Sequence, residues 1–128
     1  EVPLVEFYYK NDDLGDPLLL EDHITILKLA SREEIAQLKS EALKVNDVLR
    51  AHFAERKVRL IDFKLEFGRT TDGAILLADE VSPDTCRLWD AETNEKLDKD
   101  VFRRDLGSLT EAYEVILQRL GGESACIK

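Results

Sequence analysis

The segment Leu60-Ile61-Asp62-Phe63-Lys64-Leu65-Glu66-Phe67-Gly68 carries the strongest structural signal in this chain. Apolar and charged residues alternate along it, which is the pattern of a β-strand, because successive side chains point to opposite faces. We expect a core-facing set made of Ile61, Phe63, Leu65 and Phe67. The opposite face would carry Asp62, Lys64 and Glu66, spaced about 6.5–7 Å apart from one to the next. Since Asp and Glu are poor strand formers, this face is either a functional site or an exposed, salt-bridged surface.

This strand, over residues 58–67, is the first half of a predicted β-hairpin. A loop bounded by Gly68 and Gly73 follows it, and a second apolar run covers residues 74–81. Two such runs joined by a short loop that contains glycine are typical of a hairpin. Residues 82–97 form an irregular polar stretch, for which we expect a loop.

Helices are predicted on both sides of the hairpin. Ser31 and Glu34 have the spacing of a capping box, and an apolar stripe follows them, so we expect a helix to about Glu55. The stripe consists of Ile35, Leu38, Ala42, Val45 and Leu49. A last helix should begin near Lys99, capped by Asp98, and end at Gly121-Gly122. Its expected buried stripe is Val101 or Phe102, Leu106, Leu109, Tyr113, Ile116 and Leu120.

The remaining N-terminal elements are short. Residues 3–9 read as a strand, residues 10–17 as a turn and residues 21–29 as a short helix. The expected fold class is therefore α+β, with helices packed on an antiparallel sheet in one domain over residues 1–128. The chain begins with Glu1 and contains no methionine, so we expect an N-terminal portion to precede it.

Composition excludes several classes of partner. With 128 residues, 44% hydrophobic and 35% charged, the chain reads as a soluble globular domain. It contains no apolar run near the roughly 20 residues of a membrane span. Its net charge of −9 would repel a nucleic-acid backbone, although a small anion could still bind locally. Cys86 and Cys126 are isolated in the sequence, which favours a reducing, cytoplasmic compartment.

The hairpin offers carboxylates from two adjacent strands. Glu66 ends the first strand, and Asp79 lies near the end of the second. Two such groups suit Mg²⁺, which prefers one or two carboxylates together with phosphates and water. The alternative is a pair of surface acids, because the register is not determined closely enough to pair Glu66 with Asp79.

Further polar residues border these strands. Arg87 could bind a phosphate with two parallel hydrogen bonds, and Asp84 could accept hydrogen bonds from a ligand. The alternative pairs Arg87 with Asp84 or Asp90 and packs Trp89 under the loop. Lys64 either neutralises the acids beside it or supplies a fixed positive charge to a reaction intermediate.

Several motifs together resemble the SAICAR synthetase family, the phosphoribosylaminoimidazole-succinocarboxamide synthases, in its bacterial single-function form. They are Asp62-Phe63-Lys64-Leu65-Glu66-Phe67-Gly68, Leu77-Ala78-Asp79-Glu80-Val81-Ser82-Pro83-Asp84, Arg87-Leu88-Trp89-Asp90 and Asp98-Lys99-Asp100. The resemblance covers essentially the whole chain and implies the C-terminal lobe of an ATP-grasp-like fold. Complete members of the family are about twice this length. The resemblance therefore implies that this chain alone has little or no activity.

The resemblance implies an ATP-dependent ligase of de novo purine biosynthesis. ATP activates the carboxylate of carboxyaminoimidazole ribonucleotide, and the amine of L-aspartate then attacks it to give SAICAR, ADP and phosphate. On the matching positions, Mg²⁺ is held by Glu66 and Asp79, and the ATP site includes Lys10, Glu66 and Asp79. The ribonucleotide is surrounded by Asp62, Lys64, Asp84 and Arg87, with Asp62 and Lys64 catalytic and Arg87 at the 5′-phosphate. Asp16 matches another position of the same cleft.

Two other functions are weighed beside this one. An inositol-phosphate kinase also carries Asp-x-Lys on a strand, but its upstream proline and the glycine two residues after the lysine are missing here. A non-catalytic acidic interaction module would make no Mg·ATP contact through Glu66 or Asp79. The sequence leaves a homodimer open.

Overall fold

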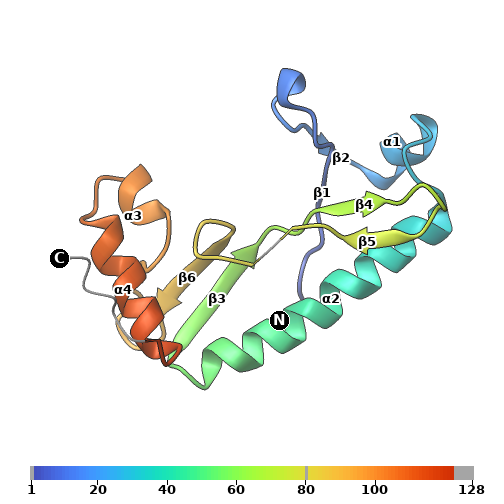
Figure 1. Cartoon of the computed structure of the whole chain (residues 1–128). Coiled ribbons are helices and arrows are strands. Elements are labelled where there is room, and N and C mark those ends of the chain that lie inside the picture. The colour runs from blue at the N-terminus through green and yellow to red at the C-terminus, as the bar shows by residue number, and fades with distance from the viewer. Residues whose placement is uncertain (1, 80, 123–128) are drawn as a thin grey trace. The chain divides into compact units, whose positions relative to one another are not determined.

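The computed structural model describes residues 2–79 and 81–122 (Figure 1). Within this part of the chain the fold is α+β, with three two-stranded antiparallel sheets and several helices. Clustering of the contacts divides the chain into two compact units, residues 1–47 and 48–128, which are described separately. None of the helices in the described residues is long and apolar enough to cross a membrane. Cys126 lies outside the described residues.

The first unit opens with a small hairpin. Strand β1 (Phe7–Tyr8) pairs antiparallel with β2 (Leu18–Leu19), and the 3₁₀ helix η1 (Asp12–Leu14) lies between them. The strand predicted over residues 3–9 is thus confirmed over two residues, because pairing with β2 stops at Tyr8. Helix α1 (Glu21–Ile26) follows, within the short helix that was predicted over residues 21–29.

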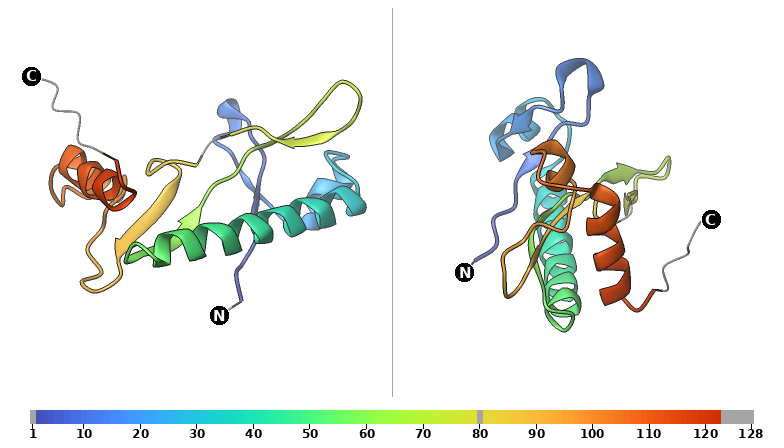
Figure 2. Two further views of the ribbon diagram at one scale, coloured as in Figure 1. Left: turned by 60° about the horizontal axis from the view of Figure 1, so that its bottom comes forward. Right: turned by 90° about the vertical axis from the view of Figure 1, so that its left-hand side faces the viewer.

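Helix α2 (Arg32–Ala54) confirms the predicted long helix and runs without interruption (Figure 2). Its capping box is present: the Ser31 N–H donates to Glu34 Oε2 at 2.7 Å, and the Glu34 N–H donates to Ser31 Oγ at 3.2 Å. Ile35 is buried, and Phe53 is buried near the C-terminal end. The other residues of the predicted stripe, Leu38, Ala42, Val45 and Leu49, are partly buried.

The predicted strand over residues 58–67 is two strands. Strand β3 (Val58–Phe63) pairs with β6 (Cys86–Asp90), and β4 (Phe67–Arg69) pairs with β5 (Ile75–Leu77). The hairpin prediction is therefore confirmed for β4 and β5. The expectation of a loop throughout residues 82–97 is wrong, because β6 occupies its middle and forms the partner of β3 (Figure 2).

The predicted face alternation fails at Ile61 in β3, whereas Phe63 packs against the core as predicted. The register runs from Val58 opposite Asp90 to Leu60 opposite Leu88, and then shifts so that Asp62 lies opposite Arg87. A β-bulge of this kind adds one unpaired residue and reverses the faces that follow it. Ile61 is that residue, and it is 40% exposed instead of lying in the core.

The core of the second unit lies between β3, β6 and the neighbouring helices. It consists of the buried residues Phe53, Val58, Cys86, Leu88, Leu97 and Ile116. Strand β6 contributes Cys86 and Leu88, each 1% exposed, because its residues alternate between buried and partly buried positions. The chain then turns back along β6, where the Leu97 N–H donates to the Leu88 carbonyl at 2.8 Å.

The last predicted helix is also divided, into α3 (Asp100–Arg103) and α4 (Leu109–Arg119). Between them Asp105 and Gly107 have positive φ values of 53° and 153°, which a helix does not allow. Ser108 then caps α4, because its Oγ accepts the N–H of Glu111 at 3.3 Å.

This division changes which residues are buried. Val101, Ala112 and Ile116 are buried, whereas Phe102 is 72% exposed and Leu106 58% exposed. The expected stripe is therefore wrong at Leu106, which lies in the break, and at Leu120, which is 41% exposed. The predicted stop is confirmed, because α4 ends at Arg119 and Gly121 has a φ of 84°.

Candidate ligand-binding site on strands β3 and β6

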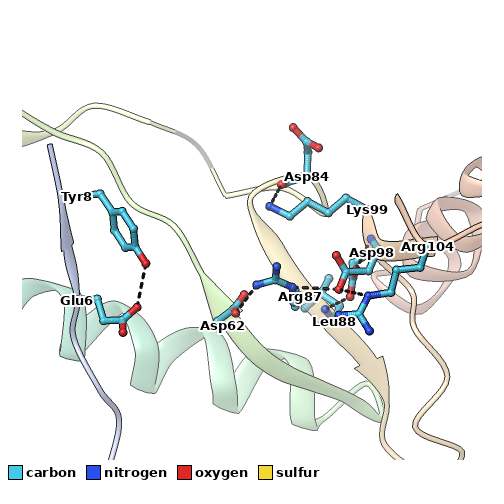
Figure 3. A network of polar contacts seen from close by, with 10 residues as sticks. Glu6, Tyr8, Asp62, Asp84, Arg87, Leu88, Asp98, Lys99 and Arg104 are labelled. Carbon is cyan, nitrogen blue, oxygen red and sulfur yellow. Dashed lines mark hydrogen bonds and ion pairs between the residues drawn. The ribbon is translucent and has the colours of Figure 1, made fainter. Parts of the chain in front are cut away.

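Asp62 and Arg87 are joined across β3 and β6. The shifted register places them opposite each other, and Arg87 Nη1 donates to Asp62 Oδ2 at 2.7 Å (Figure 3). The second carboxylate on Arg87 is that of Asp100, whose Oδ2 accepts from Arg87 Nε at 3.1 Å. The alternative pairing of Arg87 with Asp84 or Asp90 is wrong. The β3–β6 register places Asp62 opposite Arg87, and Asp100 is its second partner.

The contacts between Arg87 and its carboxylate partners favour the charged forms of Arg87 and Asp100. The hydrogen bond from Arg87 to Asp62, and the charge of that carboxylate, raise the pKa of Arg87 above its already high value. Burial of Asp100 opposes its ionisation, but the hydrogen bond and charge of Arg87 outweigh burial, so the pKa of Asp100 is lowered. Arg104 Nε lies 3.7 Å from the same oxygen, Asp100 Oδ2. Asp100 is therefore a carboxylate with two guanidinium neighbours.

The segment before α3 ties this network to the backbone of β6. Asp98 is fully buried, and its Oδ2 accepts the Leu88 N–H at 2.7 Å. Its Oδ1 accepts the N–H of Asp100 at 2.8 Å, so it binds the first residue of α3 as the predicted cap would. Lys99, assigned as the N-cap residue, makes no side-chain cap and instead donates from Nζ to the Asp84 carbonyl at 2.6 Å.

Asp84 is held through its backbone and exposes its side chain. Besides the contact from Lys99, its N–H donates to Ser82 Oγ at 3.3 Å. In Figure 3 the Asp84 carboxylate points away from Lys99. The pKa of Tyr113 is raised, mainly because the phenol is partly buried and to a smaller extent because of the negative charge of Asp84. Asp84 is thus placed to meet a ligand while its backbone is anchored.

Lys64 and Glu66 form an ion pair between β3 and β4. Lys64 Nζ lies 2.6 Å from Glu66 Oε1, and the side chains are 55% and 21% exposed. The neutralising role expected of Lys64 is therefore confirmed for Glu66, while Asp62 pairs with Arg87 instead. The Lys64 N–H also donates to the Thr85 carbonyl at 2.8 Å, which fixes the backbone where β3 leaves β6.

Glu66 and Asp79 lie at the open end of the β4–β5 hairpin. The Ala78 N–H donates to the Glu66 carbonyl at 2.7 Å, so Glu66 is next to the residue that precedes Asp79. Within residues 2–79 and 81–122 no three His, Cys, Asp or Glu side chains form a metal-binding group. Mg²⁺ needs fewer, since it takes one or two protein carboxylates beside phosphate and water oxygens. The two acids therefore fit that ion by chemical type and by the proximity of their backbones.

Lys10 and Asp16 belong to the first unit, whereas the other six predicted site residues belong to the second. Asp16 Oδ1 accepts the Asn11 N–H at 2.7 Å, and Asp16 itself has a positive φ of 49°. It closes the turn between β1 and β2. Lys10 is exposed directly before that turn. The placement of both residues in one cleft with Glu66 stays a prediction.

A SAICAR synthetase family model matches residues 1–120, which include all eight predicted site residues. The chain belongs to the SAICAR synthetase family. Membership disfavours the kinase alternative, and the α+β fold predicted from the sequence is that of this family.

Relatives and solved structures agree with this assignment. A phosphoribosylaminoimidazole-succinocarboxamide synthase of Bacillus cytotoxicus is 70% identical over 122 residues, covering 95% of this chain and 51% of the relative. The synthase of Bacillus mycoides is 66% identical, with the same coverage. A solved SAICAR synthetase (Type-2) in complex with ADP superposes with a TM-score of 0.89 at 52% identity, over 95% of this chain and 52% of that one. The synthase of Ehrlichia chaffeensis gives 0.89 at 43% identity, over 96% and 53%. The chain thus spans about half the length of the SAICAR synthetases it matches.

Sequence reasoning missed Asp100 and Lys99 as supports of this SAICAR synthetase site. Asp98-Lys99-Asp100 contributed to the family resemblance, but Asp98 alone was given a structural role, as a cap. A charged triplet directly before a helix was the available signal. The contacts of this triplet are made with β6 and the residues before it, and the sequence did not predict β6.

Proposed function

We propose that this chain is the C-terminal part of an ATP-dependent ligase of de novo purine biosynthesis. The complete enzyme joins L-aspartate to the carboxylate of carboxyaminoimidazole ribonucleotide and releases SAICAR, ADP and phosphate. The observation that carries this proposal is the match of residues 1–120 to SAICAR synthetase. The ADP bound in a solved relative supports a nucleotide substrate.

Arg87 binds the 5′-phosphate of the ribonucleotide in this proposal. Its guanidinium has five N–H groups, and its contacts with Asp62 and Asp100 engage Nη1 and Nε. The Nη2 edge remains for an oxyanion, and the side chain is 37% exposed, so a ligand can reach it. Asp84 lies two residues before the same strand, β6, and accepts hydrogen bonds from the sugar or the base.

Lys64 and Asp62 act nearest to the reacting carboxylate. Lys64 brings a positive charge beside Glu66 and stabilises negative charge that develops on the activated carboxylate. Asp62 orients Arg87 through their ion pair and contacts the ribonucleotide. Both side chains are more than half exposed, at 55% for Lys64 and 53% for Asp62, which leaves them accessible to substrate.

Glu66 and Asp79 would hold Mg²⁺ together with ATP. Lys10 would contact the nucleotide, and Asp16 would be a further polar residue near the ligands. The ion, when bound, offsets the charge of the phosphates. In the structure Glu66 is paired with Lys64, whose Nζ lies 2.6 Å from Glu66 Oε1.

We place the reaction in the cytoplasm, where its nucleotide substrates are made. Cys86 is a buried free thiol, and burial raises its pKa. Such a thiol accords with a reducing compartment.

The decisive experiment uses the complete enzyme with Glu66→Gln and Asp79→Asn. Each change removes a metal ligand's charge and should lower aspartate-dependent ADP release by about 100-fold or more, since a metal supplies several kcal/mol of charge stabilisation. Asp72→Asn is the matched control, because Asp72 lies in the loop of the same hairpin and bonds to Thr70. Unchanged activity in both site variants would favour the interaction module. ADP release that needs no aspartate would favour a kinase.

A further inference from the structure

We infer that Asp100 is a positioning residue of this site, which holds the Arg87 guanidinium in the orientation that binds the ribonucleotide phosphate. The inference rests on the proposed role of Arg87. Asp100 acts through Arg87 and does not itself contact the substrate.

The two carboxylates on Arg87 differ in burial. The Asp100 side chain is 5% exposed, whereas that of Asp62 is 53% exposed. Water screens a charge contact less when one partner is buried, so the contact of Arg87 with Asp100 is the less screened of the two, although the contact with Asp62 is shorter, at 2.7 Å against 3.1 Å. It also engages Nε, the nitrogen nearest the side-chain stem, and thereby orients the plane of the guanidinium.

Both ends of this contact are anchored to one group. The Asp98 carboxylate accepts the N–H of Leu88, the residue after Arg87, and also the N–H of Asp100. Asp98 is fully buried, so its two hydrogen bonds are shielded from water. The backbones that carry Arg87 and Asp100 are therefore joined through a single side chain, which limits their movement relative to each other.

The local charge leaves Arg87 able to attract an anion. Asp100 alone would cancel the charge of Arg87, but Arg104 lies 3.7 Å from the same carboxylate oxygen. Arg104 is 60% exposed and supplies a second positive charge at the edge of the network. Within these four side chains Arg104 thus offsets the charge of Asp100, and Arg87 offsets that of Asp62.

The test compares Asp100→Asn and Asp100→Ala in the complete enzyme. Asparagine keeps the volume and can still accept from Nε, so it should fold and raise the KM for the ribonucleotide about 3- to 5-fold. Alanine removes the contact and should raise it about 5- to 30-fold. The KM for ATP should stay within about 2-fold, because Asp100 supports the phosphate site of the other substrate.

A double variant separates positioning from general damage. If Asp100 acts through Arg87, the pair Arg87→Ala/Asp100→Ala should have the same KM as Arg87→Ala alone. The matched control is Asp90→Asn, which removes the charge of a β6 aspartate that is also paired with an arginine, Arg119. It should lower stability and leave both KM values unchanged.

Each outcome decides one question. If Arg87→Ala leaves the ribonucleotide KM unchanged, the proposed role of Arg87 itself fails. If Arg87→Ala raises that KM while neither Asp100 variant does, the positioning role fails and the proposed function stands. Additive effects in the double variant, or an equal rise in the KM for ATP, would also overturn the positioning role.

Discussion

Asp62 and Arg87 face each other across β3 and β6, with 2.7 Å between Oδ2 and Nη1. The β-bulge at Ile61 creates this relationship. If the register before the bulge continued, Arg87 would lie opposite Ile61, and the guanidinium would lose its cross-strand carboxylate. One unpaired residue in β3 thus assembles the charged pair.

Replacing Arg87 with alanine tests the phosphate contact. We expect the KM for the ribonucleotide to rise about 10- to 150-fold, because a charge-assisted hydrogen bond contributes about 1.5–3 kcal/mol. The KM for ATP should change little. Steady-state kinetics of the complete enzyme measure both values, with Arg59→Ala as the control, since Arg59 on β3 bonds to Asn94 instead. An unchanged KM for the ribonucleotide would contradict the proposed contact between Arg87 and its phosphate.

A pair of apolar variants tests the bulge. Leu88→Ala should lower the free energy of unfolding by about 2–5 kcal/mol, because Leu88 is 1% exposed and its loss leaves a cavity. Ile61→Ala should lower the free energy of unfolding by less than about 1 kcal/mol, since Ile61 is 40% exposed. Urea denaturation measures the difference. Equal losses would mean that β3 follows the regular alternation and that the register shift is absent.

Removing the Asp98 carboxylate should destabilise the second unit. Asp98→Ala leaves the N–H groups of Leu88 and Asp100 without their acceptor, at about 1–3 kcal/mol for each buried donor. Asp98→Asn keeps one acceptor oxygen and should therefore lose less stability than Asp98→Ala. Thermal unfolding of the two variants gives the order. Equal melting temperatures for wild type and Asp98→Ala would contradict the buried hydrogen bonds.

The lowered pKa of Asp90 makes the free energy of unfolding depend on pH in the acidic range. The N–H of Thr93, the guanidinium of Arg119 and the N–H of Glu92 hold the pKa of Asp90 well below its ordinary value. A carboxyl whose pKa is lowered by folding stabilises the protein above its unfolded pKa of about 3.9, and this contribution is lost as the pH falls. Urea midpoints should therefore decline below about pH 5.

The variant Asp90→Asn isolates this effect. It should be less stable than wild type at neutral pH, and the difference should shrink as the pH is lowered toward 3. A difference that stays constant over this range would show that ionisation of Asp90 is not the cause.

Local signals explain which elements the sequence predicted well. The capping box of Ser31 and Glu34 begins α2, and Gly73 lies in the turn of the β4–β5 hairpin, although Gly68 lies within β4. Each depends on residues a few positions apart. The break between α3 and α4 had such a signal too, Gly107-Ser108 followed by Glu111, but the apolar periodicity across it favoured one helix.

Non-local contacts explain the rest. Strand β6 pairs with β3 across about 25 residues, and no turn signal joins them, so the alternation of Cys86, Leu88 and Asp90 was the sole indication. The motifs placed Asp62, Lys64 and Glu66 at a site, but Asp100 reaches Arg87 through the tertiary fold. A side chain that supports another from a different element leaves no spacing pattern.

The contacts on Leu88 also affect how the molecule behaves in a crowded solution. A strand with unpaired N–H and C=O groups at its edge can recruit a strand from another molecule and start aggregation. At Leu88 both groups are engaged, the N–H by the Asp98 carboxylate and the carbonyl by the Leu97 N–H. Asp98 and the Leu97 backbone therefore cover the outer edge of β6 at this point, so substitutions at Asp98 should favour aggregation as well as lower stability.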